Sequence, residues 1–188
     1  MNARVDAVRE ADVVVLGAGA AGLSAAIGLG GRRVALVAKG PLRKTGNTPW
    51  AQGGVAGAVG PGDTPALHAA DTLAVAGELG VPAAALRLTS EGRDRLAELL
   101  ALGARFDRDA SGQLDLAREA AHSRARVLHA KDATGAEVAR ALGAALEGRS
   151  GLAVFEQARA LHLVPDGGRV GGVLVRHADG ALVLHRAR

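Results

Sequence analysis

Three glycines near the amino terminus, Gly17, Gly19 and Gly22, have the G-x-G-x-x-G spacing of dinucleotide-binding motifs. In such motifs the first glycine permits a tight turn, the second lets a pyrophosphate approach the main chain, and the third lets a helix pack closely on a strand. The amino terminus of the following helix supplies N–H donors and a positive dipole for phosphate groups. The chain has 27 glycines, so the motif also arises easily by chance and its context decides its weight.

A second glycine-rich segment, TGNTPWAQGGVAGAVG at residues 45–60, contains the chain's single tryptophan, Trp50, and the amide Gln52. The rest of the chain adds only two phenylalanines and no tyrosine. A flexible linker does not need a tryptophan, whereas a loop around a flat, polar ligand has a use for one. The alternative is an ordinary surface loop whose tryptophan covers the core.

The position expected to hold a ribose-binding acid does not carry one. In dinucleotide-binding domains this acid lies about 20 residues beyond the glycine motif, at the end of the second strand. Ala38 and Lys39 occupy that place here. Three interpretations stay open: a purely structural motif, a 2′-phosphate of NADP held by Lys39, Arg43 and Lys44, or FAD in a family that dispenses with the acid.

The residues around the glycine motif predict a βαβ unit. Residues 13–16 form a continuous apolar run, as in a strand buried on both faces. A short helix within residues 23–31 and a second strand within residues 32–40 follow. Strand, glycine turn, helix and strand within about 30 residues match a βαβ unit, and this context favours cofactor binding over a motif that serves packing alone.

The middle of the chain is predicted to be largely helical. Residues 64–80 begin with a threonine N-cap followed by proline, and residues 82–103 continue as one or two helices. Residues 134–148 begin with Thr134 and Glu137 at the spacing of a capping box.

The remaining segments predict strands and loops. Residues 104–133 have no clean period, which indicates a loop with short strands. The tail contains turn sequences, PDGG and ADG, between apolar runs, and this pattern predicts an antiparallel meander. The candidate strands of the tail are LAVFEQ, RALHLV, RVGGVLVRH and ALVLHRAR.

Composition limits the class of protein. The chain has 188 residues, 48% of them hydrophobic, which suits one ordinary domain, and no cysteine, which excludes disulfides and thiolate metal sites. No apolar run reaches membrane-spanning length, and the charged amino terminus does not match a signal peptide, so we expect a cytoplasmic protein. The net charge is +4, but the 23 basic residues are scattered among 19 acidic ones, and the chain lacks aromatic side chains on which bases could stack. Nucleic-acid binding is therefore a weak interpretation.

Four segments in this order, VVVLGAGAAGLSAAIGL, VALVAKG, GNTPWAQGG and REAAHSRARVLHAKDATG, closely resemble the L-aspartate oxidase family. These are flavoproteins of the succinate dehydrogenase and fumarate reductase superfamily, in which a lysine at the position of Lys39 is usual. The resemblance implies an α/β fold: a Rossmann-like FAD-binding domain with a βαβ start, a helical insertion and a C-terminal antiparallel β-meander, incomplete in this chain.

The resemblance also implies which residues bind FAD. Residues Gly17 and Gly22 frame the turn, Lys39 lies by the adenosine ribose, and main-chain N–H groups at the second glycine segment stabilise negative charge on reduced flavin. The pyrophosphate would be lined by Ala18, Gly19, Ala20 and Ala21, and the isoalloxazine would be wrapped by Asn47, Thr48, Pro49, Trp50, Ala51, Gln52, Gly53 and Gly54.

Asn47 implies a non-covalent flavin. Membrane-complex members of the superfamily have a histidine bonded to FAD at this position, and asparagine cannot form that bond. Aspartate oxidases commonly have serine there, so Asn47 is a mild departure that keeps a hydrogen-bonding side chain.

Glu119 is the residue that the resemblance assigns to the substrate. It matches the glutamate of an Arg-Glu-Gly-Gly-His-Ser block that dicarboxylate reductases lack, and its carboxylate would face the α-ammonium group of L-aspartate. Ala120 and Ala121 replace the two glycines of that block, and Ala117 replaces a usual threonine. If either glycine needs a positive φ, the alanine costs stability or shifts the loop. Without the resemblance, the residues predict only that Glu119 is a solvated charge on a loop.

The histidines do not indicate a metal site. His122 and His129 lack a convincing third ligand and are expected to form hydrogen bonds within the flavin domain. His162, His177 and His185 fall on the strand-rich tail and are expected at the surface.

The family activity is oxidation of L-aspartate to iminoaspartate, with oxygen or fumarate as the acceptor, on the quinolinate route to NAD. The resemblance implies small-molecule substrates and quinolinate synthase as a pathway partner. It also implies that residues 1–188 are the N-terminal part of the FAD-binding domain. The substrate-capping domain, the C-terminal helical domain and the main catalytic arginine would then lie outside the chain, which would be inactive alone. The alternatives are a soluble fumarate reductase or succinate dehydrogenase-like flavoprotein and a non-catalytic nucleotide-binding module.

Overall fold

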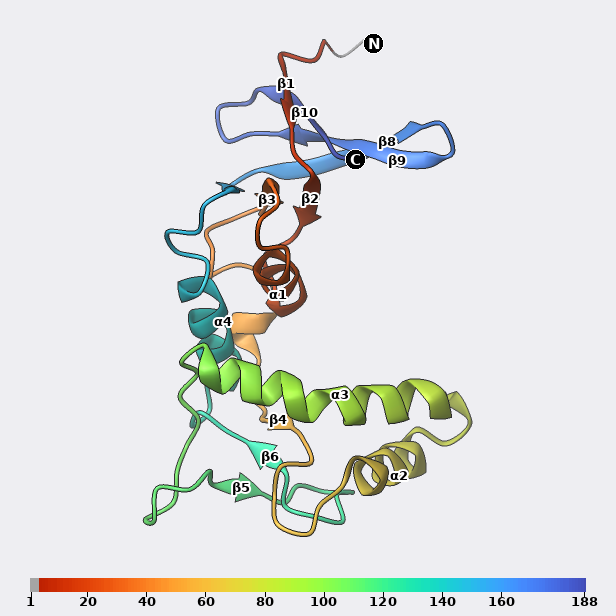
Figure 1. Cartoon of the computed structure of the whole chain (residues 1–188), viewed down its shortest axis with the longest axis vertical. Helices are drawn as coiled ribbons and strands as arrows, with labels where there is room; N and C mark the ends of the chain where they lie inside the picture. The colour runs from red at the N-terminus through yellow and green to blue at the C-terminus, as the bar shows by residue number, and fades with distance from the viewer. Residues whose placement is uncertain (1–3) are drawn as a thin grey trace. The chain divides into compact units, whose positions relative to one another are not determined.

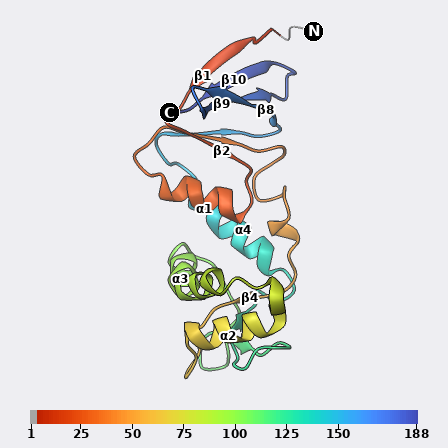
Figure 2. The same cartoon turned by 90° about the vertical axis from the view of Figure 1, so that its right-hand side faces the viewer.

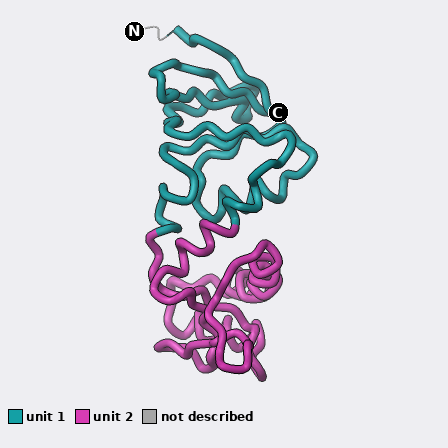
Figure 3. The backbone as a smooth tube through the Cα atoms, turned by 90° about the vertical axis from the view of Figure 1, so that its left-hand side faces the viewer, with its two compact units in different colours: residues 1–49, 142–188 teal, residues 50–141 magenta. Residues whose placement is uncertain are grey.

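The computed structural model describes residues 4–188, which divide into two compact units (Figure 3). Of the described residues, those up to Pro49 together with Leu142–Arg188 form the first unit. Trp50–Ala141 form the second.

A parallel sheet lies at the centre of the first unit. Strand β3 (Val34–Val37) pairs with β2 (Val13–Leu16) on one side and with β7 (Leu152–Phe155) on the other. Helix α1 (Ala20–Gly28) connects β2 to β3 (Figure 1). All four side chains of β3 are buried, because the strand is central and covered on both faces. The predicted βαβ unit is confirmed.

The second sheet of this unit is the predicted antiparallel meander. Strands β8 (Arg159–Asp166), β9 (Arg169–Arg176) and β10 (Leu182–Arg186) pair in chain order (Figure 2). The turn between the first two contains Gly167 and Gly168, both at positive φ, which glycine adopts without steric cost.

Two strands of the first unit differ from the sequence prediction. Strand β1 (Ala7–Glu10) pairs in parallel with β10 and was not predicted, because its sequence AVRE is exposed throughout and has no apolar alternation. The first tail candidate became β7, which joins the parallel sheet rather than the meander. Its pairing with β3 is a long-range contact that local sequence cannot specify.

The second unit contains two complete helices, the first part of a third, and a small sheet. Helices α2 (Pro65–Ala76) and α3 (Pro82–Ala101) are joined through the short 3₁₀ turn η2 (Gly77–Leu79). Thr64 caps α2 as predicted, because its Oγ1 accepts a hydrogen bond from the Leu67 N–H at 3.2 Å. The sheet is antiparallel in the order β4-β6-β5 and consists of β4 (Val55–Ala56), β5 (Leu116–Ala117) and β6 (Val127–Leu128). The core of this unit contains Leu96, Ala104, Phe106, Leu128 and Ala141.

Helix α4 (Thr134–Ala144) forms where predicted, but the predicted capping box is wrong. The Thr134 hydroxyl accepts from the Ala130 N–H at 3.0 Å. The Glu137 carboxylate accepts from the Arg105 N–H at 2.6 Å and from Arg140 Nε at 2.7 Å. A tertiary contact and an ion pair therefore replace the local contact that the spacing suggested.

Among residues 4–188, no helix combines the length and the apolar composition that crossing a bilayer requires.

Candidate functional site

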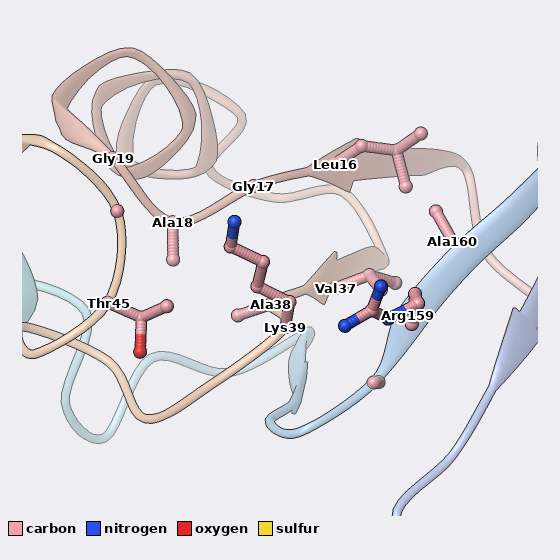
Figure 4. Close-up of a pocket in the computed structure, with 12 residues that line it drawn as sticks. Leu16, Gly17, Ala18, Gly19, Val37, Ala38, Lys39, Thr45, Arg159 and Ala160 are labelled. Atoms are coloured by element: carbon pink, nitrogen blue, oxygen red, sulfur yellow. The ribbon is translucent and has the colours of Figure 1, made fainter.

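A cavity of about 290 Å³ opens at the carboxyl ends of β2 and β3 in the first unit (Figure 4). Ligands of open α/β sheets bind at this edge. The lining combines the turn after β2, the end of β3 and the start of β8. Its residues are Leu16, Gly17, Ala18, Gly19, Val37, Ala38, Lys39, Thr45, Gly46, Ala158, Arg159 and Ala160.

The glycine motif builds the turn in the way its spacing predicts. Gly17 has φ +99°, a conformation that L side chains rarely adopt, and its N–H donates to Val37 O at 2.9 Å. A Cβ on Gly22 would lie 1.9 Å from the carbonyl oxygen of Gly17, so a side chain there would separate helix and strand. Gly17 is therefore required by its backbone conformation and Gly22 by packing, and the turn between them presents main chain to the cavity.

Thr48 connects the second glycine segment to this turn. Its Oγ1 accepts a hydrogen bond from the Ala20 N–H at 3.0 Å, in the first turn of α1. Thr48 belongs to the 3₁₀ helix η1 (Thr48–Trp50). Through this bond the start of the segment lies against the end of the βα turn, as a flavin-binding role requires.

The cavity carries positive charge. The first turn of α1 has no acidic residue, and none of the described residues that line the cavity is acidic. Lys39 is exposed and its side chain extends toward the Gly17–Ala18 turn, while Arg159 enters from the start of β8 (Figure 4). The cavity therefore suits a diphosphate, since anions are stabilised by helix N-termini and by cationic side chains.

Arg43 does not join this charged group. It is absent from the cavity lining and forms an ion pair with Glu147 instead. Lys44 is also absent from the lining, so the interpretation that Lys39, Arg43 and Lys44 jointly hold a 2′-phosphate retains only Lys39 at the cavity.

The sequence prediction missed Thr45, Arg159 and the residues beside them. Arg159 lies 120 positions beyond Lys39 and reaches the cavity because the chain returns to the sheet edge there. Ala38 N–H donates to Phe155 O, and Ala158 N–H donates to Ala38 O, each at 2.9 Å. The turn sequences of the tail indicated β8, but nothing local indicated which edge it would reach.

The second unit contains the rest of the predicted isoalloxazine segment. Trp50 is 76% exposed, so in this chain it does not cover the core. Ala51, Gln52 and Gly53 are also exposed, and a Cβ on Gly53 would meet no atom within 4 Å. These side chains and the main chain at Gly53 are therefore open to the surface of the second unit.

Position 54 must be glycine for a reason that does not depend on a ligand. A Cβ at this position would lie 2.2 Å from Val127 Cγ1 and 2.7 Å from His129 Cε1. Glycine is required because strand β6 and the residue after it pack directly on this main chain, whatever else approaches it.

Glu119 lies in the loop that joins β5 to β6, and its side chain is half exposed. Its Oε1 lies 3.2 Å from His129 Nε2. Its carbonyl oxygen accepts from the His122 N–H at 3.2 Å, which closes a tight turn. Within that turn Ala121 has φ +68°, whereas Ala120 is not in the left-handed region, so one of the two family glycines would relieve strain here.

A buried ion cluster anchors this loop. Arg126 is fully buried and forms two hydrogen bonds to Asp63, from Nε to Oδ2 and from Nη2 to Oδ1, both 2.8 Å. Its Nη1 donates to Asp71 Oδ2 at 2.5 Å. The amide and hydroxyl of Ser123 also donate to that oxygen, both at 2.8 Å. The sequence prediction missed this cluster, because the two aspartates are more than 50 residues from the arginine.

These contacts shift the ionisation of both aspartates. Hydrogen bonds from Arg126 hold the pKa of Asp63 below its usual range. The Ser123 donors, followed by Arg126, hold the pKa of Asp71 well below its usual range. Both carboxylates therefore stay charged, which a buried guanidinium requires.

His122 forms a hydrogen bond, as predicted, whereas the contact of His129 is one of ion-pair distance. His122 Nδ1 lies 3.1 Å from Arg126 Nη1, and His129 contacts Glu119. Burial lowers the pKa of His68, whose ring lies 5.6 Å from that of His122. Among residues 4–188 no three His, Asp or Glu side chains come together as a metal site.

The predicted surface position of His185 is wrong. Only 1% of this residue is exposed, because it lies within the central strand pairs of the meander and its ring packs at 4.7 Å from that of Phe155. Its Nε2 lies 2.9 Å from His177 Nε2. Burial lowers the pKa of His185 to about 4. His162 is exposed, as predicted.

Comparison with known families decides the class of this chain. The FAD binding domain family matches residues 12–188. The chain belongs to this family. The predicted fold and FAD as the cofactor are thereby confirmed.

Similar proteins narrow the class further. L-aspartate oxidase of Streptomyces coelicolor is 48% identical over 167 residues, which are 87% of this chain and 28% of that protein. Among solved structures, Mycobacterium smegmatis Sdh1 is 31% identical with a TM-score of 0.88, over 96% of this chain and 33% of that one. E. coli quinol fumarate reductase FrdA is 26% identical with a TM-score of 0.90, over 96% and 32%. The predicted resemblance is confirmed, and the chain spans about a third of the length of these relatives.

Proposed function

We propose that this chain is the FAD-binding part of an enzyme that oxidises L-aspartate to iminoaspartate, with oxygen or fumarate as electron acceptor. The observation that carries the proposal is Glu119. It presents a half-exposed carboxylate from an anchored loop, in a chain 48% identical to an L-aspartate oxidase over the matched residues. An anionic group at this place favours a ligand with an ammonium group over one with carboxylates alone.

We propose that FAD binds non-covalently. The diphosphate would accept hydrogen bonds from main chain at Ala18 to Ala21, with Lys39 by the ribose and Arg159 as a further cation. The isoalloxazine would lie against Asn47 to Gly54, where the amide of Asn47 offers no nucleophile for a covalent bond. When bound, FAD supplies the acceptor for the hydride of the substrate α-carbon.

The residues of this chain would bind and orient the substrate. Glu119 would hold the α-ammonium group, on a loop whose far end is anchored through Ser123 and Arg126. The two substrate carboxylates need cationic partners, for which arginine is best suited. We propose that the main catalytic arginine lies outside residues 1–188 and that this chain alone has no oxidase activity.

We further propose that the reaction belongs to NAD biosynthesis by the quinolinate route in the cytoplasm, where quinolinate synthase would take the product. The proposal includes either oxygen or fumarate as the electron acceptor that reoxidises the flavin.

Anaerobic bleaching of the flavin tests the proposal. L-aspartate should reduce the flavin of the full-length protein, and succinate should not. The Glu119→Gln variant should bind FAD as the wild type does, because the residue lies outside the cavity at β2 and β3. It should lose about a hundredfold in kcat/KM for L-aspartate, since a charge-assisted contact contributes about 1.5–3 kcal/mol. Reduction by succinate but not by L-aspartate would overturn the proposal.

A fumarate reductase or succinate dehydrogenase-like enzyme is the second candidate, favoured by the TM-score of 0.90 to E. coli quinol fumarate reductase FrdA. Bleaching by succinate would select it. Tight binding of NADPH without flavin would select a nucleotide-binding module instead.

A further inference from the structure

His129 is the side-chain partner of Glu119. Its Nε2 lies 3.2 Å from Glu119 Oε1, within ion-pair distance when the imidazole is protonated. Three quarters of the His129 side chain and half of the Glu119 side chain are covered. Among residues 4–188, no other side chain forms an ion pair or a hydrogen bond with this carboxylate. The second carboxylate oxygen is therefore free for a ligand.

The position of His129 is fixed by its neighbours. It follows β6, whose Val127 and Leu128 are buried, and its carbonyl oxygen accepts from the Asp107 N–H at 2.7 Å. A Cβ on Gly54 would lie 2.7 Å from His129 Cε1, so the imidazole is packed against that main chain. The ring therefore has little freedom to move away from Glu119.

Glu119 has no such support from its own element. It lies in an exposed turn, and the ion cluster anchors the loop only at its far end, through Ser123 and Arg126. Arg118 Nε donates to the His122 carbonyl oxygen at 3.0 Å, which closes the loop without contacting the Glu119 carboxylate. The direction of that carboxylate therefore depends on His129.

We propose that His129 is the positioning residue that makes the Glu119 site selective for a dicarboxylate with an ammonium group. This rests on the proposed function. The imidazole holds one carboxylate oxygen, which orients the other toward the ligand. A substrate with an ammonium group gains an ion pair from the oriented oxygen. A dicarboxylate that lacks this group gains nothing from it, so the effect of His129 is confined to amino dicarboxylates.

Steady-state kinetics of His129→Gln test the inference in the full-length, FAD-loaded protein. Glutamine keeps a donor but neither the charge nor the ring. KM for L-aspartate should rise about tenfold with kcat changed less than about twofold, since one charge-assisted contact is weakened. The inhibition constant of succinate should stay unchanged. His162→Gln, an exposed histidine on β8, is the matched control and should behave as the wild type.

A double-mutant cycle with Glu119→Gln separates positioning from general support. If His129 acts through Glu119, the double variant should be no worse than Glu119→Gln alone. Full additivity, or equal weakening of L-aspartate and succinate, would overturn the inference.

Two checks keep the outcomes distinct. If His129→Gln is poorly folded, judged by flavin absorbance and thermal unfolding, His129→Asn replaces it. In chain 1–188, Glu119→Gln should shift the side-chain ¹⁵N resonances of His129 and leave those of His162 in place, and unchanged His129 resonances would overturn the contact. A wild-type protein that binds FAD but does not respond to L-aspartate would overturn the proposed function and, with it, the selectivity. A response that His129→Gln leaves unaltered would overturn the inference alone.

Discussion

The turn at Gly17 to Gly22 and the loop at residues 118–126 present groups to a ligand by opposite means. In the turn, side chains are absent where they would collide, and a Cβ on Gly22 would lie 1.9 Å from Gly17 O. In the loop, a fully buried Arg126 is surrounded by acceptors from Asp63 and Asp71. The first device depends on steric space and the second on compensated charge.

This difference sets how each region responds to change. A buried ion pair contributes little net stability over an apolar core, but removing one partner leaves an uncompensated charge. A glycine required by packing fails when any side chain is added. The loop should therefore be sensitive to the loss of atoms and the turn to their gain.

Loss of the Arg126 charge should have the largest effect. Arg126→Met leaves the covered carboxylate of Asp63 and the partly exposed carboxylate of Asp71 without their cation, which should lower the free energy of unfolding by about 3–5 kcal/mol. Urea denaturation measures this. Arg124→Met, an exposed position in the same loop, is the control and should change stability by less than about 0.5 kcal/mol. Similar values for the two variants would show that the cluster does not anchor the loop.

Gain of a methyl group in the turn should come next. Gly22→Ala should cost about 2–3 kcal/mol and weaken FAD binding, because the Cβ collides with backbone rather than with a flexible side chain. Gly28→Ala is the matched control in the same helix, where a Cβ meets nothing within 4 Å. It should be neutral or stabilising. FAD titration and thermal unfolding of both variants measure these effects. Equal FAD affinity and stability of the two variants would show that the turn tolerates the methyl group.

The two units should lose stability over different pH ranges as the solution is acidified. The pKa values of Asp63 and Asp71 are lowered in the folded state, so their contribution is present above the ordinary value of 3.8 and is lost as the pH falls below it. The pKa of His185 in the first unit is lowered from 6.5 to about 4, whereas burial lowers the pKa of His68 in the second unit by less. The first unit should therefore lose more stability between those values. Native-state hydrogen exchange at amides of β6 and β9 can follow each unit. Loss of β6 protection before that of β9 would contradict this order.

Removal of the Thr48 hydroxyl should have a smaller effect on the turn. Thr48→Val leaves the Ala20 N–H without its acceptor, which should cost about 1 kcal/mol. Thr48→Ser keeps the acceptor and should retain most of the stability. FAD affinity and thermal unfolding would compare the two, and equal behaviour would mean that the bond does not support the helix terminus.

Restoring a glycine in the loop should give the smallest change, and a stabilising one. Ala121 has φ +68°, so Ala121→Gly should raise the free energy of unfolding by about 0.5–1 kcal/mol. Ala120→Gly should not, because Ala120 is outside the left-handed region. Denaturation midpoints of the two variants test whether the strain is confined to Ala121.

Sequence reasoning was most successful where structure is local. The βαβ unit, the cap at Thr64 and the hairpin glycines follow from neighbouring residues, and the structure has them. The capping box at Thr134 failed, because Glu137 found the Arg105 amide in three dimensions. His185 was wrongly predicted to lie at the surface. Alternation along one strand does not show which of its faces is covered by another element, here by Phe155 of β7.

The class of protein could be predicted without a structure, since the spacing of Gly17, Gly19 and Gly22 and the four family segments are properties of the chain order. Only the tertiary structure brought Arg159 to the cavity edge, enclosed Arg126 between Asp63 and Asp71, and placed His129 beside Glu119. The physical reason is that glycine conformation, caps and turns are decided within a few residues. The compensation of a buried charge needs partners that folding brings from distant positions.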